Sequence, residues 1–378
     1  MTKPFDTPIF VTRPNLPSLD ELSAGLAEIW NNRWLTNRGP LLERFEARLA
    51  ALFDLPHVSV MTNGTVALEL GLQALKLTGE VITTPFTFAA SVNAVVRTGL
   101  TPVFADIEPD HLTLDPARVE AAITPRTSAI LAVHVFGHPC RVAALEAVAA
   151  RNGLSVVYDA AHAFGVTVDG VPIGHFGDLS MFSFHATKPF HALEGGALTY
   201  RRADLRAVLE RLANHGLGAD GDVLEAGTNG KMTEVQALVG LLMLDRVAAI
   251  MERNKAIASI YRARLAALPG IDCLAPPAAG VKVNHAYAPV LVNPALAGID
   301  RDGLYDALRQ RNVFTRKYFY PAVSAMTAFR HLRAADPLEG ANQAAARVLA
   351  LPIYADLDDD DVHRICDMIT AICRRQAA

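Results

Sequence analysis

The 378-residue chain has few cysteines, no excess of basic charge and no long hydrophobic run. Its four cysteines, Cys140, Cys273, Cys366 and Cys373, are scattered, which predicts buried thiols in a reducing compartment rather than a disulfide framework. Lys and Arg together number 35, and Asp and Glu number 39, so the basic surface typical of nucleic-acid-binding proteins is not expected. No apolar run approaches the length of a membrane span.

The first 22 residues lack the apolar core of a secretory signal peptide, which together with the thiols predicts a cytoplasmic protein. The 12 histidines and four cysteines do not have zinc-site spacing, so we expect no metal. Apolar residues make up 51% of the chain and charged residues 20%. This composition is typical of a globular protein, and the length allows two domains.

Short β-rich segments alternate with helical patterns through the first half of the chain. The β-rich segments are residues 58–61, 80–83, 102–105, 128–133, 155–158, 178–184 and 197–200, and helical patterns at 65–77, 88–98, 115–123 and 141–151 separate the first five. Alternation of this kind predicts an α/β fold with a mixed, mostly parallel sheet of about seven strands. Only a loop separates the last two segments, so one of them should be antiparallel.

The chain changes character beyond Pro269-Gly270. A single helix is predicted from Glu234 to about Leu268. Beyond it the patterns predict a strand at 283–292 and helices at 300–311, 342–349 and 359–374. We therefore expect a large domain of residues 1–250 and a smaller C-terminal α+β domain of residues 251–378.

Lys188 lies in a polar loop between two strand-like segments, after Phe182-Ser183-Phe184 and before Glu194. Confinement between strands keeps the amine away from water, which lowers its pKa and suits an amine that condenses with a carbonyl. The alternative is an ordinary surface lysine in a hairpin loop.

Asp159 closes the apolar strand that ends at Tyr158. Ligands of parallel sheets bind beyond the carboxyl ends of the strands, and an ionised acid there could keep a pyridine nitrogen protonated. The same aspartate could instead cap the following helix.

Three further positions could contact a phosphorylated aromatic cofactor. Asn63-Gly64-Thr65 joins a strand to a helix, and helix N-termini bind anions, although most such turns are only caps. Ser183 could add a hydroxyl to the same phosphate or bond to the backbone of its strand. Phe88 is either a stacking platform or a core aromatic.

Together these motifs resemble the nucleotide-sugar aminotransferases of the DegT/StrS family, which are pyridoxal 5′-phosphate (PLP) enzymes of fold type I. The resemblance covers nearly the whole chain. The motifs that carry it are Gly39-Pro40 with Phe45-Glu46, Asn63-Gly64-Thr65, Pro85-Phe86-Thr87-Phe88, Phe104-Ala105-Asp106, Val133 to Gly137, Asp159-Ala160-Ala161-His162, Ser183 to Lys188 with Glu194-Gly195-Gly196, and Gly227 to Met232.

The resemblance implies a role for each residue. Lys188 would carry the cofactor and move the proton, Asp159 would pair with the ring nitrogen, and Phe88 would stack on the ring. The phosphate would be held by Gly64, Thr65 and Ser183. His162 stands where most members have glutamine, within reach of the ring's 3′-oxygen, and its charge there is expected to depend on pH. Asn229 would reach the phosphate bound by the neighbouring subunit, which implies a homodimer with shared active sites.

The family's reaction takes an amino group from glutamate, leaving pyridoxamine 5′-phosphate, and delivers it to a nucleotide-linked keto-sugar. Residues 158–165 and 316–321 resemble the subgroup that acts at C4 of dTDP-4-dehydro-6-deoxyglucose, giving dTDP-4-amino-4,6-dideoxyglucose. The residues expected to contact the sugar nucleotide are Lys231, Arg316, Lys317 and Tyr320. The basic ones could equally be solvated surface charges.

Three alternatives remain open at this stage. The amino group could go to C3 of a 3-keto sugar nucleotide. A related group of dehydratases has histidine in place of the lysine, and Lys188 argues against that activity. A non-enzymatic regulator or scaffold with the same fold should have lost the acid–lysine pair, whereas Asp159 and Lys188 are both present.

Overall fold

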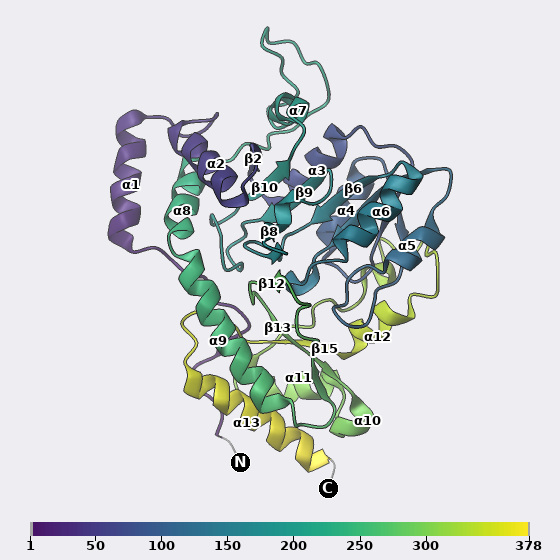
Figure 1. Cartoon of the computed structure of the whole chain (residues 1–378). Coiled ribbons are helices and arrows are strands. Elements are labelled where there is room, and N and C mark those ends of the chain that lie inside the picture. Colours follow the sequence, from purple (N-terminus) through teal and green to yellow (C-terminus); the bar gives the residue numbers. More distant parts are fainter. Residues whose placement is uncertain (1–2, 377–378) are drawn as a thin grey trace.

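A seven-stranded sheet forms the centre of the computed structural model, which describes residues 3–376 (Figure 1). Its strand order is β2-β10-β9-β6-β5-β3-β4. The strands are β2 (His57–Met61), β3 (Glu80–Thr83), β4 (Thr101–Phe104), β5 (Thr127–Val133), β6 (Ser155–Asp159), β9 (Leu179–Ser183) and β10 (Gly196–Tyr200). β10 pairs antiparallel with both β2 and β9, and the other pairs are parallel. The predicted α/β fold with a mostly parallel sheet is therefore confirmed.

Helices cover both faces of this sheet. One face is packed by α2 (Pro40–Phe53), α5 (Pro116–Ala122), α6 (Val142–Asn152) and α8 (Glu234–Leu244), and the other by α3 (Gly64–Ala74), α4 (Ala89–Arg97) and α7 (Asp204–Leu212). Successive strand side chains alternate between the faces: Ile82 and Ile130 pack in the first layer, Val81 and Leu131 in the second. The continuous apolar runs of the sequence thus reflect strands buried on both sides.

The chain around residue 245 differs from the prediction. Instead of one helix from 234 to 268, α8 ends at Leu244 and α9 (Val247–Leu265) begins after Asp245 and Arg246. The two helices share one core at their junction, because Val247 and Ile250 at the start of α9 pack with the apolar residues of α8. The apolar residues of α8 pack against the sheet, whereas Ile257, Tyr261 and Leu265 of α9 pack in the C-terminal part. α9 thus supplies side chains to both cores.

The C-terminal part is built on a second, antiparallel sheet in the order β11-β13-β15. Its elements are β11 (Ile271–Cys273), β13 (Ala288–Val292), α10 (Pro294–Ala297), α11 (Arg301–Arg309), α12 (Glu339–Arg347), β15 (Val348–Leu351) and α13 (Asp359–Gln376). The strand predicted from 283 begins only at Ala288. The helix predicted to reach 349 ends at Arg347, because Val348–Leu351 pair with β13 instead.

Short elements complete the fold. They are α1 (Leu19–Asn32), β1 (Ile9–Phe10) paired with β14 (Val313–Phe314), and the small sheet of β7 (Thr167–Val168), β8 (Val171–Pro172) and β12 (Val281–Lys282). α1 begins with a capping box of Ser18 and Glu21. The N-terminal Phe5 and Ile9 pack in the C-terminal core. The separate cores support a division into two domains near residue 250, which stays a prediction.

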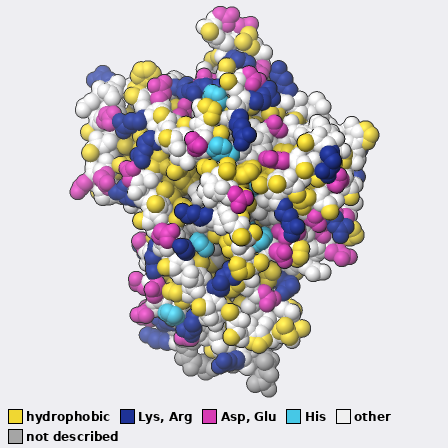
Figure 2. Space-filling model, viewed as in Figure 1, with side chains coloured by type: hydrophobic (Ala, Val, Ile, Leu, Met, Phe, Trp, Pro, Cys, Tyr) yellow, Lys and Arg dark blue, Asp and Glu magenta, His cyan; other side chains and the backbone are white. Residues whose placement is uncertain are grey.

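No helix among residues 3–376 is both long enough and apolar enough to cross a membrane. Acidic and basic side chains are interspersed over the face of the molecule in Figure 2, in keeping with the small formal net charge of −4.

Glu234, the first residue of α8, fixes the position of α2. Its side chain is 1% exposed. Its carboxylate accepts hydrogen bonds from the backbone N–H groups of Leu41 (2.8 Å) and Leu42 (3.0 Å) in the first turn of α2. Gly39 leaves room for this contact, since a Cβ there would lie 2.5 Å from Cδ of Glu234. The carboxylate thus satisfies two of the N–H groups that a helix N-terminus leaves unpaired.

We expect Glu234→Ala to lower the free energy of unfolding by about 2–4 kcal/mol, because two buried N–H groups lose their acceptor. Urea denaturation followed by circular dichroism measures this loss. Glu234→Gln retains one side-chain oxygen and should lose less. Equal stability of all three proteins would contradict the proposed cap.

Candidate active site

A cavity of about 290 Å³ lies at the carboxyl ends of the central strands. Its lining includes Gly64, Thr65, Phe88, Asp159, His162, Ser183 and Lys188. These residues come from separate strand–loop connections: β6 ends at Asp159, β9 ends at Ser183, and β2 leads into α3. The carboxyl ends of parallel strands meet at one edge of the sheet, which brings the predicted cofactor residues together.

The half-buried Lys188 contacts Tyr287 across this cavity. Nζ of Lys188 donates a hydrogen bond of 2.7 Å to Oη of Tyr287. Burial lowers the pKa of the Lys188 ammonium to about 8, although the negative charge of Asp159 acts in the opposite direction. A substantial fraction of the amine is therefore neutral near physiological pH, as a nucleophile or base requires.

Asp159 is 5% exposed. Oδ2 accepts a hydrogen bond from Oγ of Ser91 (2.7 Å), and Oδ1 accepts one from the backbone N–H of Ala161 (3.0 Å). Burial raises the pKa of the carboxyl group, whereas these hydrogen bonds and the charge of Lys188 lower it. No side chain in the described range forms an ion pair with Asp159. A buried acid with acceptor capacity and no cation of its own suits a cationic ring nitrogen.

The charge of His162 was expected to depend on pH, and the structure contradicts this expectation. Nδ1 accepts a hydrogen bond of 3.1 Å from the backbone N–H of Phe136, so Nε2 carries the proton. Burial lowers the pKa of the imidazole well below its ordinary value, and the charge of Lys188 lowers it further. The ring is therefore neutral across the physiological range and offers one N–H donor in a defined orientation.

The anion corner of the cavity is formed by the start of α3 and the end of β9. Asn63 caps α3, its Oδ1 accepting from the backbone N–H of Val66 at 2.9 Å. A Cβ on Gly64 would lie 3.1 Å from Cβ of Ser183, so glycine permits this close approach. The turn is thus a helix cap, as the alternative interpretation proposed. The cap leaves the cavity-lining Gly64 and Thr65 beside Ser183, where the dipole of α3 favours an anion.

Phe88 is not a core aromatic. Its side chain is 63% exposed and lines the cavity just before α4, whereas Phe86, two residues earlier, is completely buried. Aromatic side chains stack on planar rings. The open face of Phe88, beside Asp159 and Lys188, could therefore bind a planar ring.

The predicted sugar-nucleotide residues separate into two groups. Arg316, Lys317 and Tyr320 line an adjoining cavity of about 380 Å³, which shares Phe88 with the first. Lys317 is already paired there, because its Nζ lies 2.6 Å from Oδ1 of Asp302. Of the predicted sugar-nucleotide residues, Arg316 and Lys317 are the basic ones that line this cavity.

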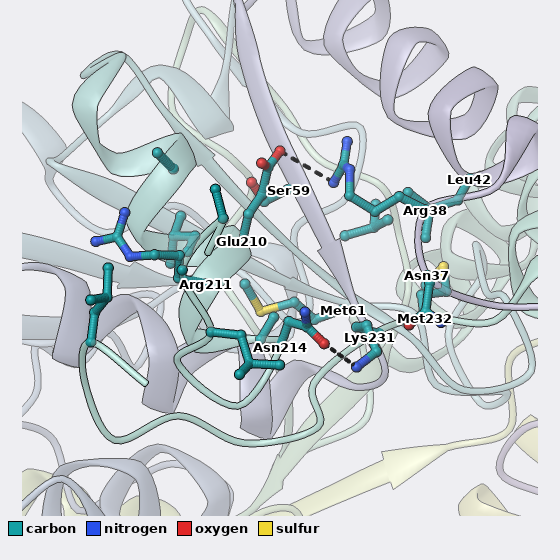
Figure 3. A pocket seen from close by; sticks show the side chains of 18 residues that line it. Asn37, Arg38, Leu42, Ser59, Met61, Glu210, Arg211, Asn214, Lys231 and Met232 are labelled. Atoms are coloured by element: carbon teal, nitrogen blue, oxygen red, sulfur yellow. Dashed lines mark hydrogen bonds and ion pairs between the residues drawn. The ribbon is translucent and has the colours of Figure 1, made fainter. Parts of the chain in front are cut away.

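Lys231 and Asn229 lie outside both of these cavities. Lys231 lines a third cavity, of about 550 Å³, where its Nζ donates to Oδ1 of Asn214 at 2.6 Å (Figure 3). Asn229 is exposed and forms a bridge with Asn214. Neither residue meets Lys188 within one chain.

Residues that were not among the predicted site residues complete the cavity. Tyr287, Tyr318 and Phe319 enter it from the C-terminal part. Ser91 follows Phe88 on the first turn of α4, and its hydrogen bond to Asp159 could have been anticipated from this helical spacing. Nothing in the local sequence around Tyr287 indicates that it approaches a lysine 99 positions away.

The lowered pKa of Lys188 can be measured in cofactor-free protein. We expect acylation of Lys188 to rise with pH to a midpoint near 8, because only the neutral amine reacts. Peptide mass mapping after brief labelling measures the rate at this lysine, and the exposed Lys255 serves as an internal reference. A midpoint at the ordinary pKa of lysine would show that the amine is solvated.

Comparison with known proteins places this site in a family. Residues 19–370 match the DegT/DnrJ/EryC1/StrS aminotransferase family. The chain is 40% identical over 368 residues to a dTDP-4-amino-4,6-dideoxy-D-glucose transaminase from Shigella dysenteriae, covering 97% of this chain and 100% of the relative. A transaminase of the same name from Escherichia coli is 40% identical over 369 residues, covering 96% and 98% of the two chains.

A solved structure agrees with these relatives. DesI, crystallised in the presence of its TDP-sugar product, is 42% identical and superposes with a TM-score of 0.94, covering 99% of this chain and 95% of its own. The resemblance seen in the sequence motifs is confirmed. The chain belongs to the DegT/DnrJ/EryC1/StrS aminotransferase family.

Proposed function

We propose that this aminotransferase uses PLP to move an amino group from glutamate to a keto-sugar linked to a nucleoside diphosphate. The observation that carries the proposal is the single cavity lined by Lys188, Asp159 and the anion corner of Gly64, Thr65 and Ser183. This set offers an amine, a buried acid and a phosphate site within one enclosure. Binding of PLP would give each of these three features a role.

When bound, PLP supplies a carbonyl that condenses with amines and a protonated ring that withdraws electrons. The protein would hold it at four points. Asp159 would keep the ring nitrogen protonated, and the neutral His162 would donate from Nε2 to the ring oxygen. Phe88 would pack on the ring face. The start of α3 and Ser183 would bind the phosphate.

Lys188 would have two tasks in the reaction. Its amine would first hold the cofactor, and once an amino acid has taken its place, the same amine would remove the α-proton and later return it. A pKa near 8 suits both directions of this transfer, because the amine can accept and release a proton near neutral pH. The enclosing aromatic side chains would limit the access of water.

We propose C4 of dTDP-4-dehydro-6-deoxyglucose as the position that receives the amino group, giving dTDP-4-amino-4,6-dideoxyglucose. The names of the two transaminases that are 40% identical support this substrate. The adjoining cavity with Arg316, Lys317 and Tyr320 provides room for the sugar nucleotide. Amination at C3 remains the alternative among enzymes. A scaffold role has less support, since the acid and the lysine line the same cavity.

We expect Lys188→Ala to retain its fold and lose all measurable turnover. Glutamate and a panel of dTDP-, UDP- and GDP-linked 4-keto and 3-keto sugars should be supplied, with products identified by NMR. The wild-type protein should aminate the dTDP-linked 4-keto sugar. Turnover by Lys188→Ala would refute the proposed role of the lysine. Amination only at C3, or only of UDP or GDP sugars, would refute the proposed substrate.

We also propose a homodimer in which each subunit completes the other's site. The segment between α7 and α8 projects from the body of the protein (Figure 1) and includes the exposed Asn229. Val223 and Leu224, in the same segment, are 58% and 59% exposed. Apolar side chains on a projecting segment are typical of a surface that contacts another chain. A second copy would give both Asn229 and these side chains a partner.

Mixing two inactive variants tests the shared site. In a heterodimer of Lys188→Ala with Asn229→Ala, one site carries both substitutions and the other carries neither. Random exchange of subunits should restore roughly a quarter of wild-type activity, because half of the dimers are mixed and each has one intact site. Different affinity tags on the two variants, captured one after the other, should confirm exchange. Activity equal to the sum of the two separate variants would contradict a shared site.

A further inference from the structure

The hydrogen bond between Lys188 and Tyr287 is not accounted for by the proposed binding of the cofactor. Tyr287 lies immediately before β13, and its ring centroid is 5.4 Å from Nζ of Lys188. Burial raises the pKa of the phenol above its ordinary value, so the hydroxyl remains protonated at any working pH. A neutral hydroxyl can accept from an ammonium group and donate to a free amine. Tyr287 can therefore bind Lys188 in either protonation state.

Tyr287 is held in position through Asn284, which precedes it in the same segment. Asn284, which is 2% exposed, donates from Nδ2 to the carbonyl oxygens of His162 (2.8 Å) and Phe164 (2.9 Å). Its Oδ1 accepts from the backbone N–H of Ala286 at 3.1 Å. These bonds tie the segment that carries Tyr287 to the loop after β6.

The aromatic surroundings restrict the ring of Tyr287 further. Its centroid lies 4.4 Å from that of His162, 5.6 Å from Phe136 and 6.0 Å from Tyr318. Gly137 leaves space for the Asn284 amide, since a Cβ there would lie 2.6 Å from Oδ1 of Asn284. A ring packed on several sides keeps its hydroxyl in one place, whereas a lysine side chain is flexible.

We propose that Tyr287 is a positioning residue that holds the free amine of Lys188 inside the cavity during the part of the reaction in which the lysine is not joined to the cofactor. The inference rests on the proposed function, because it assigns Tyr287 to a stage of that reaction. Asn284 acts through Tyr287 by fixing its backbone.

The charged groups around Lys188 explain why the free amine needs a hydrogen-bond partner such as Tyr287. The titratable side chains that line the cavity with it are Asp159, His162, His185, Glu194, Tyr287 and Tyr318. A released ammonium would be drawn toward the carboxylate of Asp159, which raises the pKa of Lys188. That movement would take the amine toward Asp159, which would hold the ring nitrogen, and away from the proton that the amine must move. The hydrogen bond to Tyr287 opposes it, and His162 and Tyr318 offer no negative charge at neutral pH.

The first test uses cofactor-free protein, so that it does not depend on turnover. The pH dependence of Lys188 acylation should be compared in wild type, Tyr287→Phe and Tyr318→Phe, with peptide mass mapping. We expect the midpoint of Tyr287→Phe to fall by about one pH unit, because a hydrogen bond to the charged amine is stronger than one to the neutral amine. Tyr318→Phe is the control, a half-buried tyrosine of the same cavity that does not hydrogen-bond to Lys188. Tyr318 raises the pKa of Lys188 only through its charge, so its removal should lower the midpoint by much less than Tyr287→Phe does.

The second test uses the loaded enzyme with glutamate deuterated at the α-carbon. Tyr287→Phe should lower kcat at an unchanged KM and increase the primary isotope effect, because a poorly placed amine slows proton transfer itself. A Tyr287→Phe protein with the wild-type midpoint, or with an unchanged isotope effect, would overturn the inference. Turnover by Lys188→Ala would instead overturn the proposed function, and the acylation midpoints would still report on the contact.

Discussion

The parallel pairing of β6 with β9 is the constraint on which the site depends. In its register Asp159 lies opposite Met181, so the strand that ends in the acid and the strand that leads to the lysine loop finish side by side. Pairing in this register cannot shift by one residue without turning every side chain of the strand to the other face. The apolar layers on both sides of the sheet resist such a shift, and they thereby fix the separation of the acid and the amine.

Burial shifts the pKa values of Lys188 and Asp159 in opposite directions. It lowers the pKa of Lys188 and raises that of Asp159, since a low-dielectric site disfavours both charged forms. Their mutual attraction opposes both shifts. Neither side chain neutralises the other through a direct ion pair, because Lys188 bonds to Tyr287 and Asp159 to Ser91. The site therefore keeps an available amine and an available carboxylate in one enclosure, which is the arrangement that amino-group transfer through a cationic ring requires.

The cavity also lies between two separately packed parts of the chain. The sheet supplies the acid, the lysine loop and the anion corner, whereas Tyr287, Tyr318 and Phe319 come from the C-terminal part. Asn284 joins them through bonds to the loop that carries His162. Any relative movement of the two parts would consequently change the surroundings of Lys188.

The sequence by itself determined the sheet and the grouping of Lys188, Asp159, Gly64 and Ser183, because strand–helix alternation brings strand ends to one edge. It did not predict the break at Asp245, because the helical periodicity of the sequence runs across that position. Only the tertiary structure decided the neutral state of His162, the exposure of Phe88 and the contact of Tyr287 with Lys188. Those properties depend on burial and on hydrogen bonds between residues far apart in the chain, and local pattern carries neither.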